Sequence, residues 1–265
     1  MLPERIVCLT EEPTEVLYAL GEEHRIVGIS GFTVRPARAR REKPKVSAFT
    51  SADVPAILAL RPDLVIGFSD LQAEIARDLI RAGIEVWISN HRTVAGILGY
   101  VRRLGAMVGA AERADRYAES LAAHLAAVER AAQSLPLRPR VYFEEWDDPM
   151  ITAIGWVAEL VRIAGGHDVF PERSLPLAKD RILRDAGEIV AAAPDLILAS
   201  WCGKKVRADA IASRPGFGGL SAVARGAIVE VDSSIILQPG PAALTDGLDA
   251  LAAAIRKVAT DLAAH

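Results

Sequence analysis

The sequence predicts an α/β protein built as two α/β lobes with mainly parallel sheets, joined by a single long helix. Short runs rich in Val and Ile alternate with helical patterns, which is typical of βαβ units that feed a parallel sheet. One stretch without Gly or Pro, Ala110 to Leu135, separates two halves that share a local pattern. The expected domains are therefore an N-terminal lobe (1–105), a connecting helix (106–136) and a C-terminal lobe (137–265).

The first half contains four strand patterns, each followed by turn residues and a helical pattern. The expected strands are 5–9, 26–29, 64–67 and 85–88, and the expected helices are 14–20, 55–60, 73–82 and 94–104. Parallel strands need such crossover helices, so we expect one layer of four strands.

The central stretch places its apolar residues on one face of a helix, from Leu104 through Leu121 to Val128. A helix of this length spans on the order of 35 Å at ~1.5 Å per residue, which is long for an ordinary crossover helix. Pro136 and Pro139 end it.

The second half repeats the alternation and adds an internal repeat. The expected strands are 140–144, 196–199 and 228–231, and the expected helices are 156–164, 186–193 and 245–262. Residues 57–66 (ILALRPDLVI) resemble residues 189–198 (IVAAAPDLIL), where a helix ends at a Pro-Asp turn that leads into a buried strand. One copy in each half favours paired lobes.

Composition excludes several classes of protein. The chain has 265 residues, 51% hydrophobic and 25% charged, and a net charge of -3 without a basic stripe, so we expect neither disorder nor a nucleic-acid partner. No apolar run reaches the ~18 residues of a spanning helix, so we expect a protein that is not embedded in a membrane. Cys8 and Cys202 lack metal-ligand spacing and are expected to be buried free thiols.

Several short segments carry a family resemblance. Residues 5–9 (RIVCL), 14–21 (TEVLYALG), 26–30 (IVGIS), 60–66 (LRPDLVI) and 164–166 (AGG) are similar to recurrent segments of the helical-backbone substrate-binding proteins of ABC importers for cobalamin, iron-siderophores and haem. Cobalamin-binding members are the most similar. The resemblance implies two lobes joined by one long helix, a ligand cleft between them and no catalytic residues. It also implies the ligand class, a corrinoid such as cobalamin or another metal chelate, with no covalent cofactor.

Candidate ligand-binding residues follow from the strand ends, because ligands of open α/β sheets bind beyond the carboxyl ends of the strands. The expected lining is Glu12, Phe32, Phe68, Asp70, Gln72, Asn90, His91 and Arg92 from the first half, and Glu145, Trp146, Asp147, Trp201 and Gln238 from the second. Trp146 and Trp201 directly follow strands, which favours stacking on a ligand over packing between the lobes. Trp156 opens an amphipathic helix and is expected to be structural.

Two features permit other chemistry. The acidic segment 144–148 could hold a hard cation or a basic ligand group, although a solvated loop is the more common meaning of such a run. His91 could ligate the metal of a corrin or haem, although a plain surface histidine is more common. We therefore expect no metal site. The alternative function is an enzyme that uses Glu144, Glu145 or Asp147 with His91 as acid and base groups.

The partner and the location follow from departures from the family pattern. Permease docking in the family uses one surface glutamate per lobe, and those places hold Pro55 and Gly187 here, with Glu188 adjacent to the second. Docking on an ABC permease is therefore doubtful, unless other residues such as Glu188 serve. The N-terminus shows no signal-peptide pattern, which predicts a cytoplasmic location, or an extracytoplasmic one if a leader has been removed.

Overall fold

The structure, a computed structural model, describes residues 2–174 and 177–264 and divides the chain into two compact units. Unit 1 consists of Met1–His91, Ala95–Ala122 and Gln238–Pro241, and unit 2 consists of Arg92–Val94, Ala123–Leu237 and Ala242–His265. Two short segments thus belong to the unit opposite to the one that their place in the sequence suggests.

Unit 1 contains a five-stranded parallel sheet with the strand order β3-β2-β1-β4-β5. The strands are β1 (Ile6–Cys8), β2 (Ile26–Ser30), β3 (Lys45–Ser47), β4 (Leu64–Phe68) and β5 (Val86–Ser89). Strand β3 was not predicted, because three residues in a basic run carry too little periodicity to mark a strand. The strand order reverses at β1 and β4, so the loops after these strands diverge and leave room at the carboxyl edge of the sheet.

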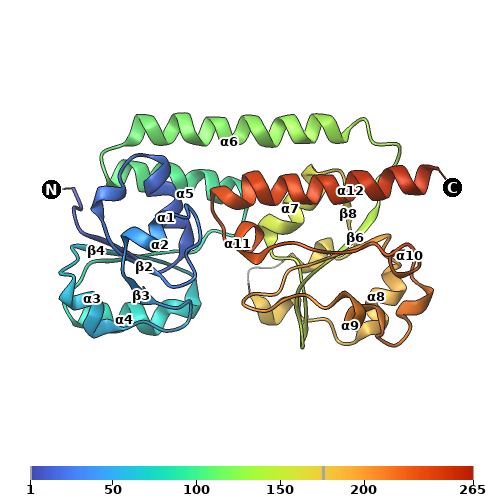
Figure 1. Ribbon diagram of the computed structural model, residues 1–265, viewed down its shortest axis with the longest axis horizontal. Coiled ribbons are helices and arrows are strands. Elements are labelled where there is room, and N and C mark those ends of the chain that lie inside the picture. Colours follow the sequence, from blue (N-terminus) through green and yellow to red (C-terminus); the bar gives the residue numbers. More distant parts are fainter. Residues whose placement is uncertain (1, 175–176, 265) are drawn as a thin grey trace. The chain divides into compact units, whose positions relative to one another are not determined.

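Helices cover both faces of this sheet (Figure 1). They are α1 (Glu11–Ala19), α2 (Ala39–Glu42), α3 (Val54–Ala59), α4 (Ala73–Arg81) and α5 (Val94–Met107), with short 3-10 turns η1 (Glu23–Arg25) and η2 (Asp70–Gln72). Val7 and Val65 face a buried cluster with Ile57 of α3 and Leu79 of α4. Because side chains alternate along a strand, Ile6 and Cys8 are buried on the opposite face.

The predicted connecting helix is real but shorter than expected. Helix α6 spans Ala111–Ala132, and α5 ends four residues earlier at Met107. Gly109 has a φ of +75°, a left-handed conformation that suits glycine and separates the two helices. The pattern of apolar residues continues across this break, so periodicity alone placed the start of the helix too early.

Unit 2 contains a mixed sheet with the order β10-β9-β6-β7, and β8 pairs with β6. The strands are β6 (Arg140–Asp147), β7 (Met150–Thr152), β8 (His167–Asp168), β9 (Leu196–Ala199) and β10 (Ile228–Glu230). Strand β6 runs three residues beyond the predicted end and pairs antiparallel with β7. The expectation of a solvated loop at 144–148 was therefore wrong, because most of that segment belongs to a β-hairpin.

Helices also cover both faces of the second sheet, with α7 and α12 on one side and α8, α9 and α10 on the other (Figure 1). The helices are α7 (Gly155–Ile163), α8 (Ala186–Ala192), α9 (Ala208–Ala212), α10 (Ser221–Ala224), α11 (Ser233–Ile236) and α12 (Leu248–Ala263), the last preceded by a π-turn, η6 (Ala243–Gly247). Further 3-10 turns are η3 (Pro171–Arg173), η4 (Ala178–Arg181) and η5 (Phe217–Gly219). One buried hydrophobic core cluster of unit 2 includes Tyr142, Ile189, Ile197 and Phe217.

The internal repeat corresponds to one structural device used in both units. Arg61 and Ala193, the residues before each Pro-Asp, have left-handed φ values of 49° and 42°. In unit 1, Oδ1 of Asp63 accepts a hydrogen bond from the backbone N–H of Arg5 at 3.0 Å. The repeat thus anchors the start of the first strand of each sheet, because Oδ2 of Asp195 accepts from the N–H of Arg140 at 2.9 Å.

Two sequence expectations about surface and burial can be checked in the described residues. None of the described helices is long and apolar enough to cross a membrane. Cys8 is buried as expected, but Cys202 is exposed, since it follows β9 in a turn rather than lying in a core strand. The expectation for Cys202 was wrong.

Candidate ligand-binding surfaces

The carboxyl end of β1 places two carboxyl groups at the start of α1. Glu11 is 8% exposed and Glu12 is 1% exposed. Burial raises the pKa of Glu11 to about 7. Burial also raises the pKa of Glu12 to about 8, although a hydrogen bond from Thr10 Oγ1 to Glu12 Oε1, 2.7 Å long, lowers it in part. Neither carboxyl forms an ion pair within the described part of the chain, so both titrate near neutral pH.

Glu12 is also enclosed from the side by backbone. A Cβ added at Gly240 would lie 2.7 Å from the Cβ of Glu12, so only glycine fits there. Gly240 belongs to Gln238–Pro241, the segment that the later part of the chain contributes to unit 1. Gln238 itself is half-buried in this segment. The backbone at Gly240 thus packs directly against the Cβ of Glu12.

His91 is a buried aromatic residue rather than a loop residue open to solvent. Its ring stacks on Tyr100 with centroids 4.8 Å apart and meets Phe68 edge-on at 5.3 Å. Nε2 lies 2.7 Å from the carbonyl oxygen of Pro239. Because Nε2 is engaged with a backbone carbonyl, this geometry does not favour metal ligation through that nitrogen.

The other predicted residues of unit 1 divide into exposed and structural ones. Phe32 is 45% exposed, and Asp70 and Asn90 are also exposed at strand ends. Gln72 is fully buried, and its amide oxygen accepts from the N–H of Phe68 while its amide nitrogen donates to the carbonyl of Phe49. Phe68 and Gln72 are therefore buried beneath the strand ends, whereas the side chain of Phe32 reaches solvent.

In unit 2 three carboxylates of the acidic segment, those of Glu144, Glu145 and Asp147, each have a cation of their own. Glu144 is fully buried and receives both arms of the Arg214 guanidinium, one of them at 3.0 Å. Glu145 receives both arms of Arg181 at 2.6 and 2.8 Å. Bidentate pairs of this kind leave few lone pairs for another ligand. A cation site in this segment is therefore disfavoured, and nowhere in residues 2–174 and 177–264 do three or more His, Cys, Asp or Glu side chains gather as metal ligands.

Asp147 completes the series with Lys204, whose Nζ lies 2.5 Å from Oδ1. Burial alone would raise the pKa of Asp147, but the hydrogen bond and charge of Lys204 outweigh burial and hold this pKa below its ordinary value. A general base for neutral pH needs a pKa near 7, so this geometry gives the enzyme alternative no support.

The two candidate tryptophans differ in exposure. Trp146 lies within β6 rather than after it, is half-buried, and its Nε1 donates to the carbonyl of Asp148 at 2.9 Å. Trp201 is 4% exposed and its Nε1 donates to Oε1 of Glu144 at 3.2 Å. Lys204 Nζ lies over both rings, 4.2 and 4.9 Å from their centroids. Trp146, Trp201 and Lys204 thus form one side-chain cluster.

Two further residues considered from the sequence, Arg92 and Trp156, belong to unit 2. Arg92 is half-buried. Trp156 is buried and its Nε1 donates to the carbonyl of Ile236 at 2.9 Å, which confirms its structural role.

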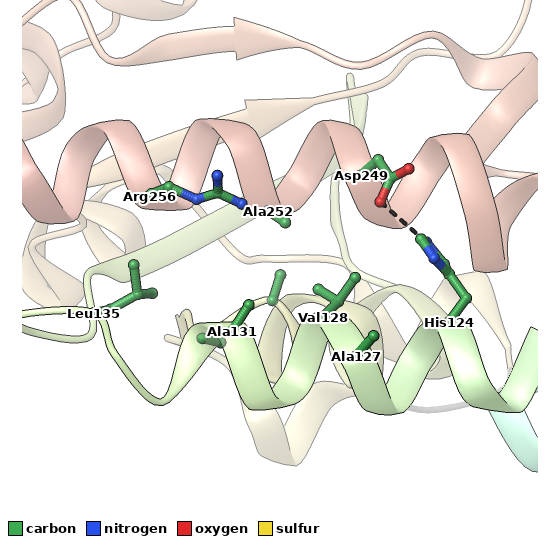
Figure 2. A pocket seen from close by; sticks show the side chains of 10 residues that line it. His124, Ala127, Val128, Ala131, Leu135, Asp249, Ala252 and Arg256 are labelled. Carbon is green, nitrogen blue, oxygen red and sulfur yellow. Dashed lines mark ion pairs between the residues drawn. The ribbon is translucent and has the colours of Figure 1, made fainter.

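The described residues of unit 2 include two pockets. One, of about 360 Å³, lies between α6 and α12, where His124 and Asp249 point toward each other at 3.0 Å and small side chains such as Ala131 line the wall (Figure 2). It contains none of the predicted residues. The other, of about 580 Å³, lies at the carboxyl ends of β9 and β10 and includes Trp201 and Lys204. Only this second pocket coincides with a predicted surface.

Sequence reasoning missed the cations that organise unit 2. Arg181 and Arg214 lie in or next to short irregular segments that have no periodic pattern. Lys204 could have been found from the sequence, because it comes directly after the strand-end residues Trp201-Cys202-Gly203. Tyr100, fully buried against His91, was hidden in a helical pattern.

The family model described as periplasmic binding protein matches residues 6–235. The chain belongs to this family. Its members are extracytoplasmic binding proteins rather than enzymes, so the expectation of a cytoplasmic location finds no support there.

Curated relatives include a vitamin B12-binding protein of Vibrio vulnificus (strain CMCP6), 27% identical over 176 residues, which are 65% of this chain and 64% of that protein. A cobalamin-binding protein of Halobacterium salinarum (strain ATCC 29341 / DSM 671 / R1) is 24% identical over 90% of this chain and 66% of its own length. The matches thus span slightly less than two thirds of these relatives.

Solved structures show the same fold. The periplasmic heme-binding protein RhuT from Roseiflexus sp. RS-1, in apo form, has a TM-score of 0.81 and 24% identity over 97% of this chain and 99% of that one. The periplasmic vitamin B12 binding protein BtuF of Vibrio cholerae has a TM-score of 0.75 and 22% identity over 97% and 98%. These likenesses confirm the predicted fold class of two α/β lobes with mainly parallel sheets.

Proposed function

We propose that the chain is the substrate-binding component of an ABC importer and that its ligand is a corrinoid or a related metal chelate. The family supports the binding role. The ligand class is supported by relatives named for vitamin B12, cobalamin and heme.

The observation that carries the proposal is the apolar character of the strand ends in unit 1. Six large hydrophobic side chains are markedly exposed in the described residues, and three of them, Phe32, Val34 and Leu71, lie in the segments that follow β2 and β4. Exposed large apolar side chains favour a binding surface, and the edge where the strands end is where α/β sheets bind ligands. A large, flat and partly apolar ligand suits such a surface.

The proposed contacts are taken from each unit by itself, according to exposure. In unit 1 the side chains of Phe32, Asp70 and Asn90 are exposed and are candidate contacts. In unit 2 the side chains of Trp146 and Asp147 are partly exposed and are candidate contacts. The buried predicted residues are proposed to support these contacts, and they are Glu12, Phe68, Gln72, His91 and Trp201. Arg92, Glu145 and Gln238 are half-buried, like Trp146 and Asp147.

Calorimetry and tryptophan fluorescence with cyanocobalamin and with haemin test this function. We expect micromolar or tighter binding of at least one of them, with quenching that is reduced in Trp146→Ala. Phe32→Ala should weaken binding about fivefold, the effect of losing roughly 1 kcal/mol of aromatic contact. The matched control is Ile80→Ala, which truncates a side chain that is 60% exposed on α4. If neither compound binds at micromolar protein, the proposal is wrong.

The proposed partner is an ABC permease, docked without the usual pair of glutamates. Pro55 and Gly187 are both exposed near the starts of α3 and α8. Glu188 is not an open acidic anchor, since its carboxylate accepts from the Arg173 guanidinium at 2.7 Å and from the N–H of Arg184 at 2.6 Å. Docking therefore uses other side chains. Fractionation of the native host tests the role, because a permease partner requires the protein on the outer side of the cytoplasmic membrane.

A further inference from the structure

The pocket at the carboxyl ends of β9 and β10 has a fixed cation on its rim. Lys204 lines this pocket of about 580 Å³, together with Trp201 and Lys205. Its Nζ is placed by three side chains: the rings of Trp146 and Trp201, over which it lies, and the carboxylate of Asp147. An ammonium held by two aromatic faces and a carboxylate loses much of its rotational freedom.

The ammonium retains capacity to donate. A lysine side chain has three N–H donors, and Asp147 is the hydrogen-bond partner that the described residues offer to Nζ. The side chain of Lys204 is 41% exposed. The donors that Asp147 does not use can therefore serve a group that enters the pocket.

The charges around the pocket are arranged unevenly. Lys204 and Lys205 lie on the turn after β9, whereas Glu230 and Asp232 lie at and beyond the end of β10. Both carboxylates are engaged with backbone, since Glu230 Oε1 accepts from the N–H of Val206 at 3.0 Å and Asp232 Oδ1 from that of Ser234 at 2.8 Å. The turn after β9 carries two lysines, of which Lys204 is paired with Asp147, whereas the end of β10 carries two carboxylates, so the positive charge of the pocket lies on the turn.

We infer that Lys204, supported by Lys205, anchors a carboxylate of the ligand at this rim, so that the ligand is a tetrapyrrole that carries acidic side chains rather than only amides. The inference rests on the proposed function and narrows its ligand class. The indole of Trp146 beside the lysine offers an apolar surface to the ring system, while the ammonium receives the acid group.

The test compares two probes that differ only in this charge, haemin and its dimethyl ester, in which both carboxylates are esterified. We expect the full chain to bind haemin at least about tenfold more tightly than the ester, the effect of roughly one charge-assisted hydrogen bond. Lys204→Met should remove most of this preference by weakening haemin binding and leaving ester binding unchanged. Lys205→Met should have a smaller effect in the same direction.

Lys257→Met, which removes an exposed lysine of α12, is the matched control and should change neither affinity. Equal binding of acid and ester overturns the inference while the proposed function stands. Tighter haemin binding by Lys204→Met also overturns it, because the lysine would then be covering the indoles rather than anchoring the ligand. If neither haemin, its ester nor cyanocobalamin binds, the proposed function falls and the inference falls with it.

Discussion

The strand ends of the two units bury carboxyl groups in opposite ways. In unit 1, Glu11 and Glu12 are buried without a cation, and burial raises the pKa of Glu12 to about 8. In unit 2, Glu144 and Glu145 are held by the guanidinium groups of Arg214 and Arg181. The carboxyl groups that follow β1 are thus kept by burial that favours their neutral form, whereas those within β6 are kept in ion pairs.

The two arrangements are expected to respond differently to pH. An acid that is neutral because of burial responds to pH around neutrality, whereas a carboxylate in a bidentate ion pair depends on the partner's geometry. We therefore expect unit 1 to be sensitive to pH and unit 2 to be sensitive to the loss of a cation.

The largest effect is expected from Arg214→Met. The change leaves the fully buried Glu144 without its cation, and breaking a buried pair from one side costs roughly 3 kcal/mol or more. Denaturant unfolding measures the loss of free energy. Arg207→Met is the control, because Arg207 forms a surface pair with Asp209 at 3.6 Å, and its loss should change stability by less than about 1 kcal/mol.

A double variant tests whether the lost charge balance is the cause. Glu144→Gln added to Arg214→Met removes the uncompensated charge while keeping acceptors for Trp201. The double variant should regain part of the stability. A double variant as unstable as the sum of both single changes would contradict the ion-pair explanation.

Gly240→Ala is expected to have the next largest effect. The added methyl group would lie 2.7 Å from the Cβ of Glu12 and 3.3 Å from its Cα, so the segment Gln238–Pro241 must shift. Overpacking of this kind costs about 1–3 kcal/mol. Gly218→Ala is the control, because a Cβ there meets nothing within 4 Å. Thermal unfolding compares them, and equal stability would show that the enclosure of Glu12 is loose.

The Pro-Asp repeat predicts a smaller effect that differs between the units. Asp63 accepts hydrogen bonds from the N–H groups of both Glu4 and Arg5, whereas Asp195 accepts from that of Arg140. Asp63→Ala should therefore destabilise by more than Asp195→Ala, with about 1 kcal/mol for each lost bond. Chemical denaturation of both variants measures the order, and the reverse order would contradict this comparison.

The fold could be predicted from the sequence because periodicity and the repeat are local signals. The repeat at residues 57–66 and 189–198 corresponds to the same turn in both units. The paired cations could not be predicted, since Arg181 reaches Glu145 from a segment 36 residues away with no periodic pattern. The burial of His91 was missed for a similar reason: its partner Pro239 is 148 residues distant.

The pH dependence of stability for the wild type and Glu12→Gln tests the central contrast most directly. The pKa of Glu12 rises from an ordinary 4.5 to about 8 on folding, so the folded chain keeps a proton that the unfolded chain loses. This stabilisation is complete below pH 4.5 and is lost as the pH rises through about 8. We expect wild-type unfolding free energy to fall between pH 5.5 and 8.5, and Glu12→Gln to fall less steeply. Glu74→Gln, whose side chain is 74% exposed on α4, should follow the wild type. Parallel curves for wild type and Glu12→Gln would contradict the account.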